Sequence, residues 1–196
     1  IDNAIQYSIV AIDYFEDSLP FLTVLTDCYI KKMDMEGMKT ILDIHNQLFL
    51  YEPLIYKKAE ILFMLSDWKA LISTYEDIAI RFYSEASELD ELIDRIIEIG
   101  NVTNNLQLSV ISLINISKAY PTHLTIKDEI INISVNTDNY IIAIEYLSSF
   151  SDKYSTYDDK IILSRLYMMT NDYTSAYQIS KNLYRANTID FELLEI

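Results

Sequence analysis

Apolar residues recur at steps of three and four along most of the chain, which is the spacing of one face of an α-helix. Leu22, Leu25 and Tyr29 follow this spacing, and Leu163 and Tyr167 repeat it far along the chain. The 196 residues include only 2 Gly and 3 Pro, so few residues interrupt the helical pattern. Sheet folds rely on many Gly-rich turns, and we therefore predict an all-α protein.

A five-residue signature separates the helical stretches. Each copy begins with Asp or Asn, continues with a large apolar residue and two variable residues, and ends at an anchor residue. The copies occupy residues 34–38, 67–71, 105–109, 139–143 and 172–176. The anchors stand 33, 38, 34 and 33 residues apart, and Ala4 lies 34 residues before the first anchor, Met38. We predict that the Asp or Asn caps a helix, because its side chain can accept a hydrogen bond from an unpaired backbone N–H.

The signature divides the chain into pairs of helices. We predict a first helix before each signature, near 21–33, 54–66, 88–100, 124–136 and 157–170. A second helix follows each signature, near 37–51, 68–84, 105–119, 139–151 and 173–187, and a further second helix lies near 1–18. Pro20, Pro53 and Pro121 lie between pairs, where proline ends one helix and can open the next.

The pairs predict one continuous domain over residues 1–196, with no visible linker. Its units lie near 21–53, 54–86, 88–121, 124–155 and 157–188. The second helix of an incomplete unit precedes them at 1–18, and a further helix starts at 190–196, with Phe191 in its first turn. Because the chain begins at Ile1 rather than Met, we expect it to be a segment of a longer protein.

The Asp172-Tyr173 copy with Ala176 and the Asn139-Tyr140 copy with Ala143 resemble the tetratricopeptide repeat (TPR) family. The resemblance covers nearly the whole chain, although the repeats are degenerate. A period of about 34 residues is typical of such helix-pair solenoids. The resemblance implies a right-handed α-α superhelix, a TPR-like solenoid of antiparallel helix pairs. Such solenoids bind peptides or proteins on a concave face and seldom carry their own chemistry.

The family places small residues at two facing sites, one in the first helix and one opening the second, because the two backbones approach there. The equivalent pairs are Thr26/Met38, Ala59/Leu71, Ile97/Ser109, Ile131/Ala143 and Ser164/Ala176. A large residue always faces a small one or Thr, as close packing requires, since overfilling a core costs about 1–3 kcal/mol. The glycine that the family often carries in the first helix is absent. We expect the two members of each pair to face each other.

The resemblance also implies which residues line the concave face. These candidate partner-binding residues are Asp27, Lys31, Tyr56, Glu60, Phe63, Met64, Glu91, Asp94, Glu98, Asp128, Asn132, Arg165, Met168 and Met169. The best-known members of the family hold a C-terminal carboxylate here with Lys, Asn and Arg. The central sites of this chain are mostly acidic or neutral, so we do not expect that carboxylate clamp. The exposed Tyr, Phe and Met residues either anchor a partner or fill contacts between units, and both interpretations stay open.

Acidic residues cluster between Glu85 and Glu98. Glu91, Asp94 and Glu98 follow at steps of three and four, which places them on one helix face. One interpretation is a groove for a Lys/Arg-rich partner segment. The other is a solvated helix face, which is the usual meaning of a run of charges. For Trp68, which occupies the large apolar place of its signature, we predict a structural role.

Net charge narrows the class of partner. The chain has 30 acidic and 15 basic residues, a formal net charge of −15. Nucleic acids and anionic membrane surfaces are bound through Lys and Arg, so we exclude nucleic acid as a partner, and an anionic membrane surface is disfavoured. Other proteins or peptides, especially those with basic segments, are favoured. No run of 18 apolar residues occurs, and we expect no membrane span in this segment.

Side chains that could carry catalysis are sparse and scattered. Cys28 is the lone cysteine, and neither His45 nor His123 is expected near it, so no Cys–His pair forms. Gly37 and Gly100 are the only glycines, which excludes a Gly-rich phosphate loop. No zinc-binding motif of two His on one helix occurs. We therefore predict no enzymatic activity, no catalytic residues, no metal and no cofactor.

These observations predict a non-enzymatic scaffold or adaptor that binds proteins within a larger assembly. The alternative is a regulatory sensor domain that binds a peptide or small ligand in its concave groove. Heavy use of Ile, Asn, Tyr, Lys and Asp is typical of an AT-rich genome, and we expect a bacterial source. Related solenoids serve in envelope, motility and secretion complexes, and we expect a role of that kind. The segment is compatible with both periplasm and cytoplasm.

Overall fold

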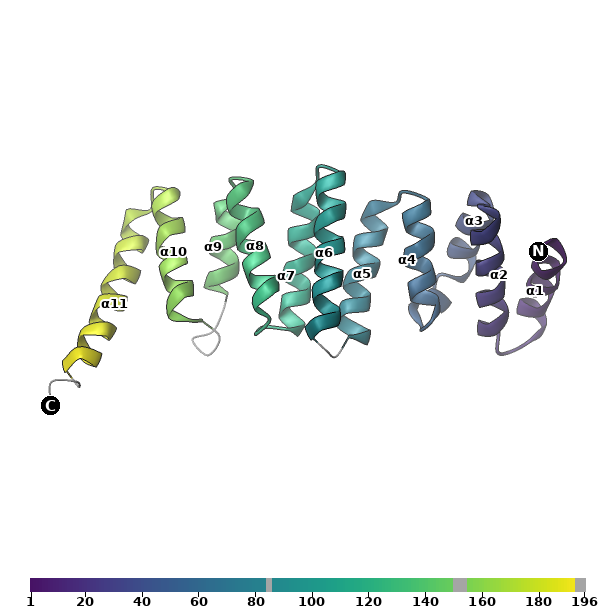
Figure 1. Cartoon of the computed structure of the whole chain (residues 1–196), viewed down its shortest axis with the longest axis horizontal. Coiled ribbons are helices and arrows are strands. Elements are labelled where there is room, and N and C mark those ends of the chain that lie inside the picture. Colours follow the sequence, from purple (N-terminus) through teal and green to yellow (C-terminus); the bar gives the residue numbers. More distant parts are fainter. Residues whose placement is uncertain (84–85, 150–154, 193–196) are drawn as a thin grey trace. The chain divides into compact units, whose positions relative to one another are not determined.

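The structure, a computed structural model, describes residues 1–83, 86–149 and 155–192. Every regular element among them is a helix, which confirms the predicted all-α class (Figure 1). The chain divides into two compact units, Ile1–Ser112 and Leu113–Ile196, and each is described by itself. Successive helices within each unit run antiparallel to each other (Figure 1).

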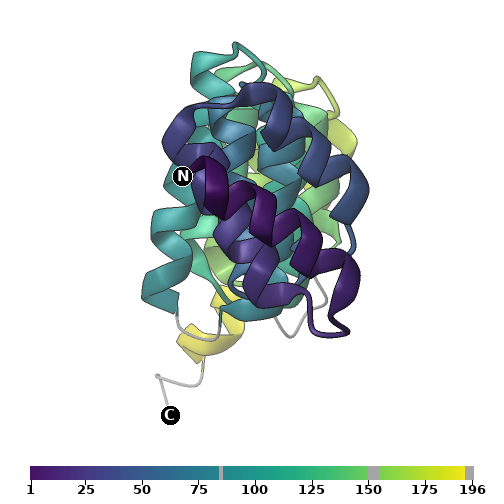
Figure 2. The ribbon, with the colours of Figure 1, turned by 90° about the vertical axis from the view of Figure 1, so that its right-hand side faces the viewer.

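Unit 1 contains α1 (Asp2–Tyr14), α2 (Leu19–Lys32), α3 (Met35–His45), a short 3-10 helix (Leu48–Leu50), α4 (Leu54–Met64), α5 (Trp68–Phe82), α6 (Ala86–Val102) and the start of α7 (Leu106–Ala119). Helix α1 packs along α2, as the view from the N-terminal end shows (Figure 2). One core cluster joins α2, α3, the 3-10 helix and α4, through Leu22, Leu25, Met38, Ile41, Phe49, Leu54 and Ile61. These residues have the apolar periodicity from which the helices were predicted.

Unit 2 contains the rest of α7 with α8 (Leu124–Asn136), α9 (Tyr140–Ser148), α10 (Tyr157–Met169) and α11 (Tyr173–Glu192). Its core cluster is formed by Ile131, Ala143, Leu147 and Leu166. One predicted element is wrong: α11 runs unbroken to Glu192, so no new helix begins near Phe191. No Gly or Pro occurs between 187 and 192 to end α11, and residues 193–196 lie outside the described part.

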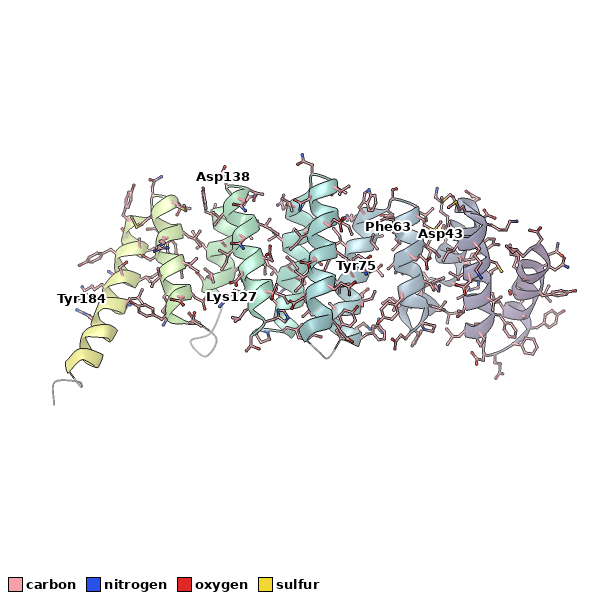
Figure 3. The ribbon with its side chains drawn as sticks, in the orientation of Figure 1. Asp43, Phe63, Tyr75, Lys127, Asp138 and Tyr184 are labelled. Carbon is pink, nitrogen blue, oxygen red and sulfur yellow. The ribbon has the colours of Figure 1, made fainter. Side chains whose placement is uncertain are left out.

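Five turns share one backbone geometry, and each stands directly before a signature. The residues with positive φ at these turns are Met33, Ser66, Asn104, Asp138 and Asn171, with φ between 52° and 61° (Asp138 is labelled in Figure 3). The next residue then donates its N–H to the carbonyl five residues earlier, as Asp34 does to Tyr29 and Asp67 to Leu62, both at 3.0 Å. This is the Schellman arrangement, which satisfies the last carbonyls of a helix. The sequence period is therefore a recurring backbone turn.

The Asp residues of the signature cap the helix that follows. Asp34 accepts a hydrogen bond from the N–H of Gly37 at 2.9 Å, and Asp67 accepts one from Ala70 at 3.2 Å. Asp172 does the same for Ser175, at 3.1 Å. The predicted caps are thus confirmed at the three Asp copies.

At Asn139 the predicted cap is wrong. The Asn139 side chain makes no capping hydrogen bond, and its amide donates instead to the Thr137 hydroxyl at 3.3 Å. An amide carries donors as well as an acceptor, so Asn has a local alternative that Asp lacks. The backbone of Asn139 still takes its place in the Schellman turn, because its N–H donates to the Ser134 carbonyl at 2.8 Å.

The predicted facing sites lie in the interior, with one change. Ser164 donates to the Ala176 carbonyl at 3.1 Å, directly across its helix pair. Ser109 is fully buried, but it donates to the Ile96 carbonyl at 2.7 Å, and Ile97 is only half-buried. A Cβ added to Gly100 would lie 2.3 Å from the Ser109 hydroxyl oxygen. Gly100 therefore allows the close approach of α6 and α7 opposite Ser109, where the family resemblance implied Ile97.

A buried ion pair joins α8 and α10 in unit 2. Lys127 lies 2.8 Å from Asp159, and their side chains are only 13% and 4% exposed (Lys127 is labelled in Figure 3). Asp159 also forms a capping box with Thr156 at the start of α10. Burial acts to raise the pKa of Asp159, but hydrogen bonds from Lys127 and Thr156 outweigh it, and the net shift is downward. The folded state therefore favours the charged carboxylate.

We predict that Met33→Gly stabilises the protein. Met33 is 71% exposed at φ 53°, so the substitution removes little packing and relieves the contact of Cβ with the following carbonyl. The free energy of unfolding should rise by about 0.5–1 kcal/mol in urea titrations. Lys31→Gly, two residues earlier in helical backbone, is the control and should lower it by about 0.5–1 kcal/mol. Equal losses for both variants would show that Met33 does not hold the left-handed conformation.

We also predict that Asp159→Asn destabilises the protein in a pH-dependent way. At neutral pH it leaves Lys127 without its charged partner, at a cost of about 1–3 kcal/mol. Because the folded pKa is lowered, the stabilisation by Asp159 is present above the unfolded pKa, about 3.9, and is lost as pH falls through the folded pKa. Urea titrations should therefore converge for the two proteins in acid. Asp158→Asn, at the exposed neighbouring position, should change stability little at any pH. A pH-independent difference would contradict the lowered pKa.

Candidate functional site

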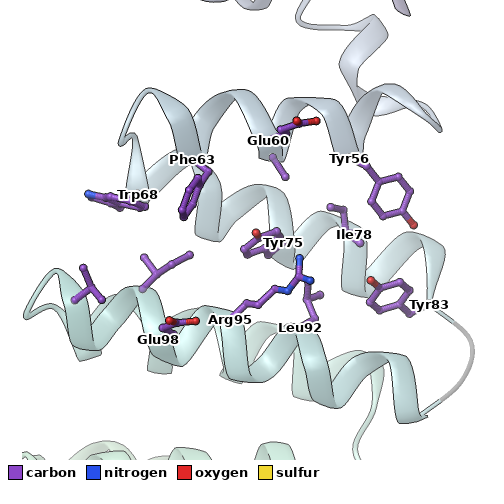
Figure 4. Close-up of a pocket in the computed structure, with 13 residues that line it drawn as sticks. Tyr56, Glu60, Phe63, Trp68, Tyr75, Ile78, Tyr83, Leu92, Arg95 and Glu98 are labelled. Atoms are coloured by element: carbon purple, nitrogen blue, oxygen red, sulfur yellow. The ribbon is translucent and has the colours of Figure 1, made fainter. Parts of the chain in front are cut away.

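Helices α4, α5 and α6 of unit 1 enclose a groove of about 630 Å³ (Figure 4). Its lining is largely apolar and includes five aromatic side chains. The lining residues are Tyr56, Ala59, Glu60, Phe63, Trp68, Tyr75, Ile78, Tyr83, Leu92, Arg95, Glu98, Ile99 and Val102. A pocket of this size, with a few polar groups in an apolar wall, is typical of a binding site.

Helical spacing brings these side chains to one place. On α4, Tyr56, Glu60 and Phe63 follow at steps of four and three, and share one face. On α6, Arg95 and Glu98 stand three residues apart, so they face α4 from the opposite wall (Figure 4). Helix α5 lies between α4 and α6 and supplies Trp68 and Tyr75. All lining residues except Tyr83, which follows the end of α5, lie on these three helices, so regular hydrogen-bonded backbone holds most of the groove.

Aromatic contacts mark the two ends of the groove. At one end Phe63 and Trp68 meet edge to face, with ring centroids 5.7 Å apart and planes at 81°. At the other end Tyr56 on α4 and Tyr83, which follows α5, both line the groove (Figure 4). Burial raises the pKa of both Tyr56 and Tyr83, with nearby Glu side chains adding to the effect. Both phenols are therefore neutral at physiological pH and can donate as well as accept hydrogen bonds.

Arg95 lies in the middle of the groove with its charge already matched. Its guanidinium donates to Glu91 at 2.6 Å, one turn earlier on α6. The hydrogen bonds to Glu91 and Tyr75 raise the pKa of Arg95 further above its ordinary value. Arg95 is thus a permanent cation whose position is set by one carboxylate and one phenol.

The carboxylates of the groove differ in their partners. Glu60 lies 3.5 Å from Lys57, which also contacts Asp27 at 2.9 Å. The hydrogen bond that Lys57 donates to Asp27 is the largest cause of the raised pKa of Lys57. Within the part of the chain that the structure describes, Glu98 makes neither a hydrogen bond nor an ion pair. Glu98 is therefore the uncompensated charge of the groove.

Four of the predicted partner-binding residues line the groove: Tyr56, Glu60, Phe63 and Glu98. Asp27 and Glu91 are indirectly connected to it, through Lys57 and Arg95. The predicted acidic stripe therefore separates into three different environments, because Asp94 is exposed and outside the lining. Sequence spacing placed the three acids on one face but did not show which of them meets a neighbouring helix.

Other predicted residues lie elsewhere. Met64 packs against the core of unit 1 and does not line the groove. Helix α4 ends at Met64, and its side chain turns toward the core cluster. Lys31 is exposed on α2, outside the groove. The remaining candidates belong to unit 2, on α8 and α10, and are all exposed: Asp128, Asn132, Arg165, Met168 and Met169.

Nine lining residues were missing from the predicted set, and four of them are aromatic or charged: Trp68, Tyr75, Tyr83 and Arg95. Trp68 was assigned a purely structural role, but it is half-buried, packs on Phe63 and lines the groove. The sequence did contain a signal for Trp68. The large apolar residue of each signature is the first residue of the second helix, and it therefore lies beside the end of the first helix. Tyr83 follows the end of α5 at Phe82, although the sequence predicts a helix that continues to 84.

Two general findings concern the described residues. No group of three or more His, Cys, Asp or Glu side chains among them is arranged to hold a metal ion. Nor does any described helix combine the length and apolar character needed to cross a bilayer. Cys28 is buried on α2. The groove in unit 1 therefore contains the most distinctive grouping of side chains on which a function can be based.

Comparison with known proteins adds no assignment. No protein-family model matches the chain, and no curated protein matches it. Function has to be inferred from the groove, its lining residues and their charges.

Proposed function

We propose that this chain is a non-enzymatic adaptor or scaffold segment that binds a peptide segment of another protein in the groove between α4, α5 and α6. The observation that carries this proposal is the set of five aromatic side chains in a groove of about 630 Å³. Phe63 is 59% exposed and Tyr56 is 37% exposed, although both are large aromatic side chains. Aromatic residues are enriched where proteins bind one another.

The chemistry of the lining favours binding over catalysis. The lining contains no Ser, Thr, Cys, His or Lys, so a hydroxyl or thiol nucleophile of Ser, Thr or Cys with a His or Lys base is absent from it. Its cation, Arg95, is engaged with Glu91 and Tyr75. What the groove offers a ligand is apolar surface, phenol hydroxyls and carboxylates, which suit a peptide of mixed polarity.

We further propose that the helix pairs continue as a TPR-like solenoid, a right-handed superhelix with the groove on its concave face. The five Schellman turns at near-equal intervals support this assignment, as do the Asp caps that follow three of them. In this proposal the segment belongs to a bacterial envelope, motility or secretion complex and joins partners there. The net charge of −15 supports partners with basic segments.

A second candidate function is regulatory. The groove volume lies within the range of about 300–1,000 Å³ that small-molecule pockets occupy, so a small ligand could also fill it. In that case the chain is a sensor whose groove binds a small ligand. A ligand-dependent rise in melting temperature without any protein partner would favour the sensor over the adaptor.

The adaptor proposal predicts that peptides selected from a random displayed library bind in the groove. Trp68 is the only tryptophan of the chain and lines the groove, so its fluorescence should change when a selected peptide binds. Phe63→Ala should weaken the binding roughly tenfold or more, as loss of a central aromatic anchor does. Ile44→Ala is the control, because Ile44 is 69% exposed on α3 and outside the groove.

Two results would count against the adaptor. One is a library that yields no peptide able to change Trp68 fluorescence. The other is selected peptides that bind equally well to the wild type and to Phe63→Ala, because their site would then lie elsewhere.

A further inference from the structure

We propose that one end of the groove, the aromatic corner formed by Phe63, Trp68 and Glu98, binds a Lys or Arg side chain of the partner segment. This inference rests on the proposed peptide-binding function and adds the chemistry of the partner. Phe63 comes from α4, Trp68 from the start of α5 and Glu98 from α6, so the corner exists only where the three helices meet.

The rings supply one half of cation recognition. Phe63 and Trp68 meet edge to face at 5.7 Å, and both lie at the same end of the groove (Figure 4). In such a pair the ring that contributes its edge keeps its faces available to other groups. The faces of aromatic rings are negative and attract ammonium and guanidinium groups within about 6 Å, most strongly for Trp. The exposure of Phe63 leaves this end open to a ligand.

Glu98 supplies the other half. Figure 4 shows it on α6, across the groove from Phe63 and Trp68. Glu98 has no hydrogen bond or ion pair with the described part of the chain, whereas Glu60 contacts Lys57 and Glu91 contacts Arg95. An exposed carboxylate without a partner, across the groove from two aromatic rings, is complementary to a cation. A neutral or acidic side chain of the partner at this place would leave the Glu98 carboxylate unpaired.

The surroundings suit the long stem of a basic side chain. Ile99 and Val102 also line the groove and lie within about one turn of Glu98 on α6. Val102 is 72% exposed, so it has apolar surface to offer. Lys and Arg bury their methylene groups against such surface while the charged head contacts polar partners. The excess of acidic residues over the whole chain further attracts a basic segment.

Arg95 sets the polarity along the groove. It lies between the aromatic corner and the Tyr56–Tyr83 end, and it occupies the Glu91 carboxylate, which is therefore not available to a cation in the middle of the groove (Figure 4). The basic side chain is therefore directed to the corner, away from the middle of the groove. The backbone of the bound peptide passes Arg95, where peptide carbonyl groups can accept its remaining N–H donors.

The test uses four pools of synthetic peptides of one length, with Arg, Lys, Gln or Glu at one central position and randomised neighbours. Binding is measured by titration of Trp68 fluorescence on the whole chain. The Arg and Lys pools should bind up to roughly tenfold more tightly than the Gln pool, because only they can pair with the Glu98 carboxylate, and the Glu pool should bind most weakly. The preference should also shrink as salt is raised.

Two variants, each of which removes one carboxylate of α6, show which carboxylate attracts the basic side chain. Glu98→Gln should remove most of the preference for Arg and Lys over Gln. Asp94→Asn removes the same charge one turn earlier on the same helix, but Asp94 is exposed and outside the groove lining, so this variant should keep the preference. Circular dichroism of both variants confirms that the helices remain.

Three results would overturn the inference, and they differ in whether the proposed peptide-binding function also fails. Equal loss of preference in Glu98→Gln and Asp94→Asn would mean that overall charge, not the corner, attracts the peptide. Tight binding of the Gln pool that depends on Phe63 would refute the cation site but leave the peptide-binding groove. If no pool changes Trp68 fluorescence or binds at all, the cation site and the proposed function both fail.

Discussion

The Schellman turn that ends the first helix of each pair is the constraint on which the rest of the structure depends. It satisfies the last carbonyls of one helix and leaves the next residue ready to cap the following helix. At the turn between α4 and α5, Ser66 donates to the Phe63 carbonyl and Asp67 to the Leu62 carbonyl. Asp67 then caps α5, with Trp68 as its first residue. The same turn that reverses the chain thus brings Phe63 and Trp68 together.

The groove follows from this arrangement with the addition of one more helix. Helices α4 and α5 provide the aromatic side chains, and α6 provides Arg95 and Glu98. Because Arg95 is held by Glu91 and Tyr75, the positive charge of the groove is fixed in its middle. Glu98, one turn away, has no such partner. The groove thus has a paired charge, Arg95, in its middle and an unpaired charge, Glu98, toward one end. The proposed site for a basic side chain lies at that end.

Sequence period was enough to predict the all-α class, the helix positions and the Asp caps, because each depends on local chemistry. The left-handed residues were only partly predictable. Asn104, Asp138 and Asn171 are of types that tolerate positive φ, whereas Met33 and Ser66 give no such signal. Contacts between helices were harder to predict: Ser109 bonds Ile96 and lies against Gly100, and Asn139 uses its amide locally. Such contacts depend on how two backbones approach, which periodicity does not determine.

The candidate site shows the same division. Tyr56, Glu60, Phe63 and Glu98 were predicted because they share faces of first helices. Arg95 and Tyr75 were not, since their roles depend on a hydrogen bond between two helices. Met64 stands next to Phe63, yet it faces the core, because one residue turns a helical side chain by about 100°. Single-residue register at helix ends is the step at which prediction from sequence failed.

The central claim is that one backbone turn recurs through the chain and sets the register of its helix pairs. Solution NMR tests it directly, through the backbone φ angles of Met33, Ser66, Asn104, Asp138 and Asn171. Three-bond couplings between HN and Hα, together with the intraresidue HN–Hα NOE, distinguish the left-handed from the right-handed conformation. Positive φ at all five residues is the result expected. Helical or extended φ at these positions, and at Ser66 above all, would contradict the account.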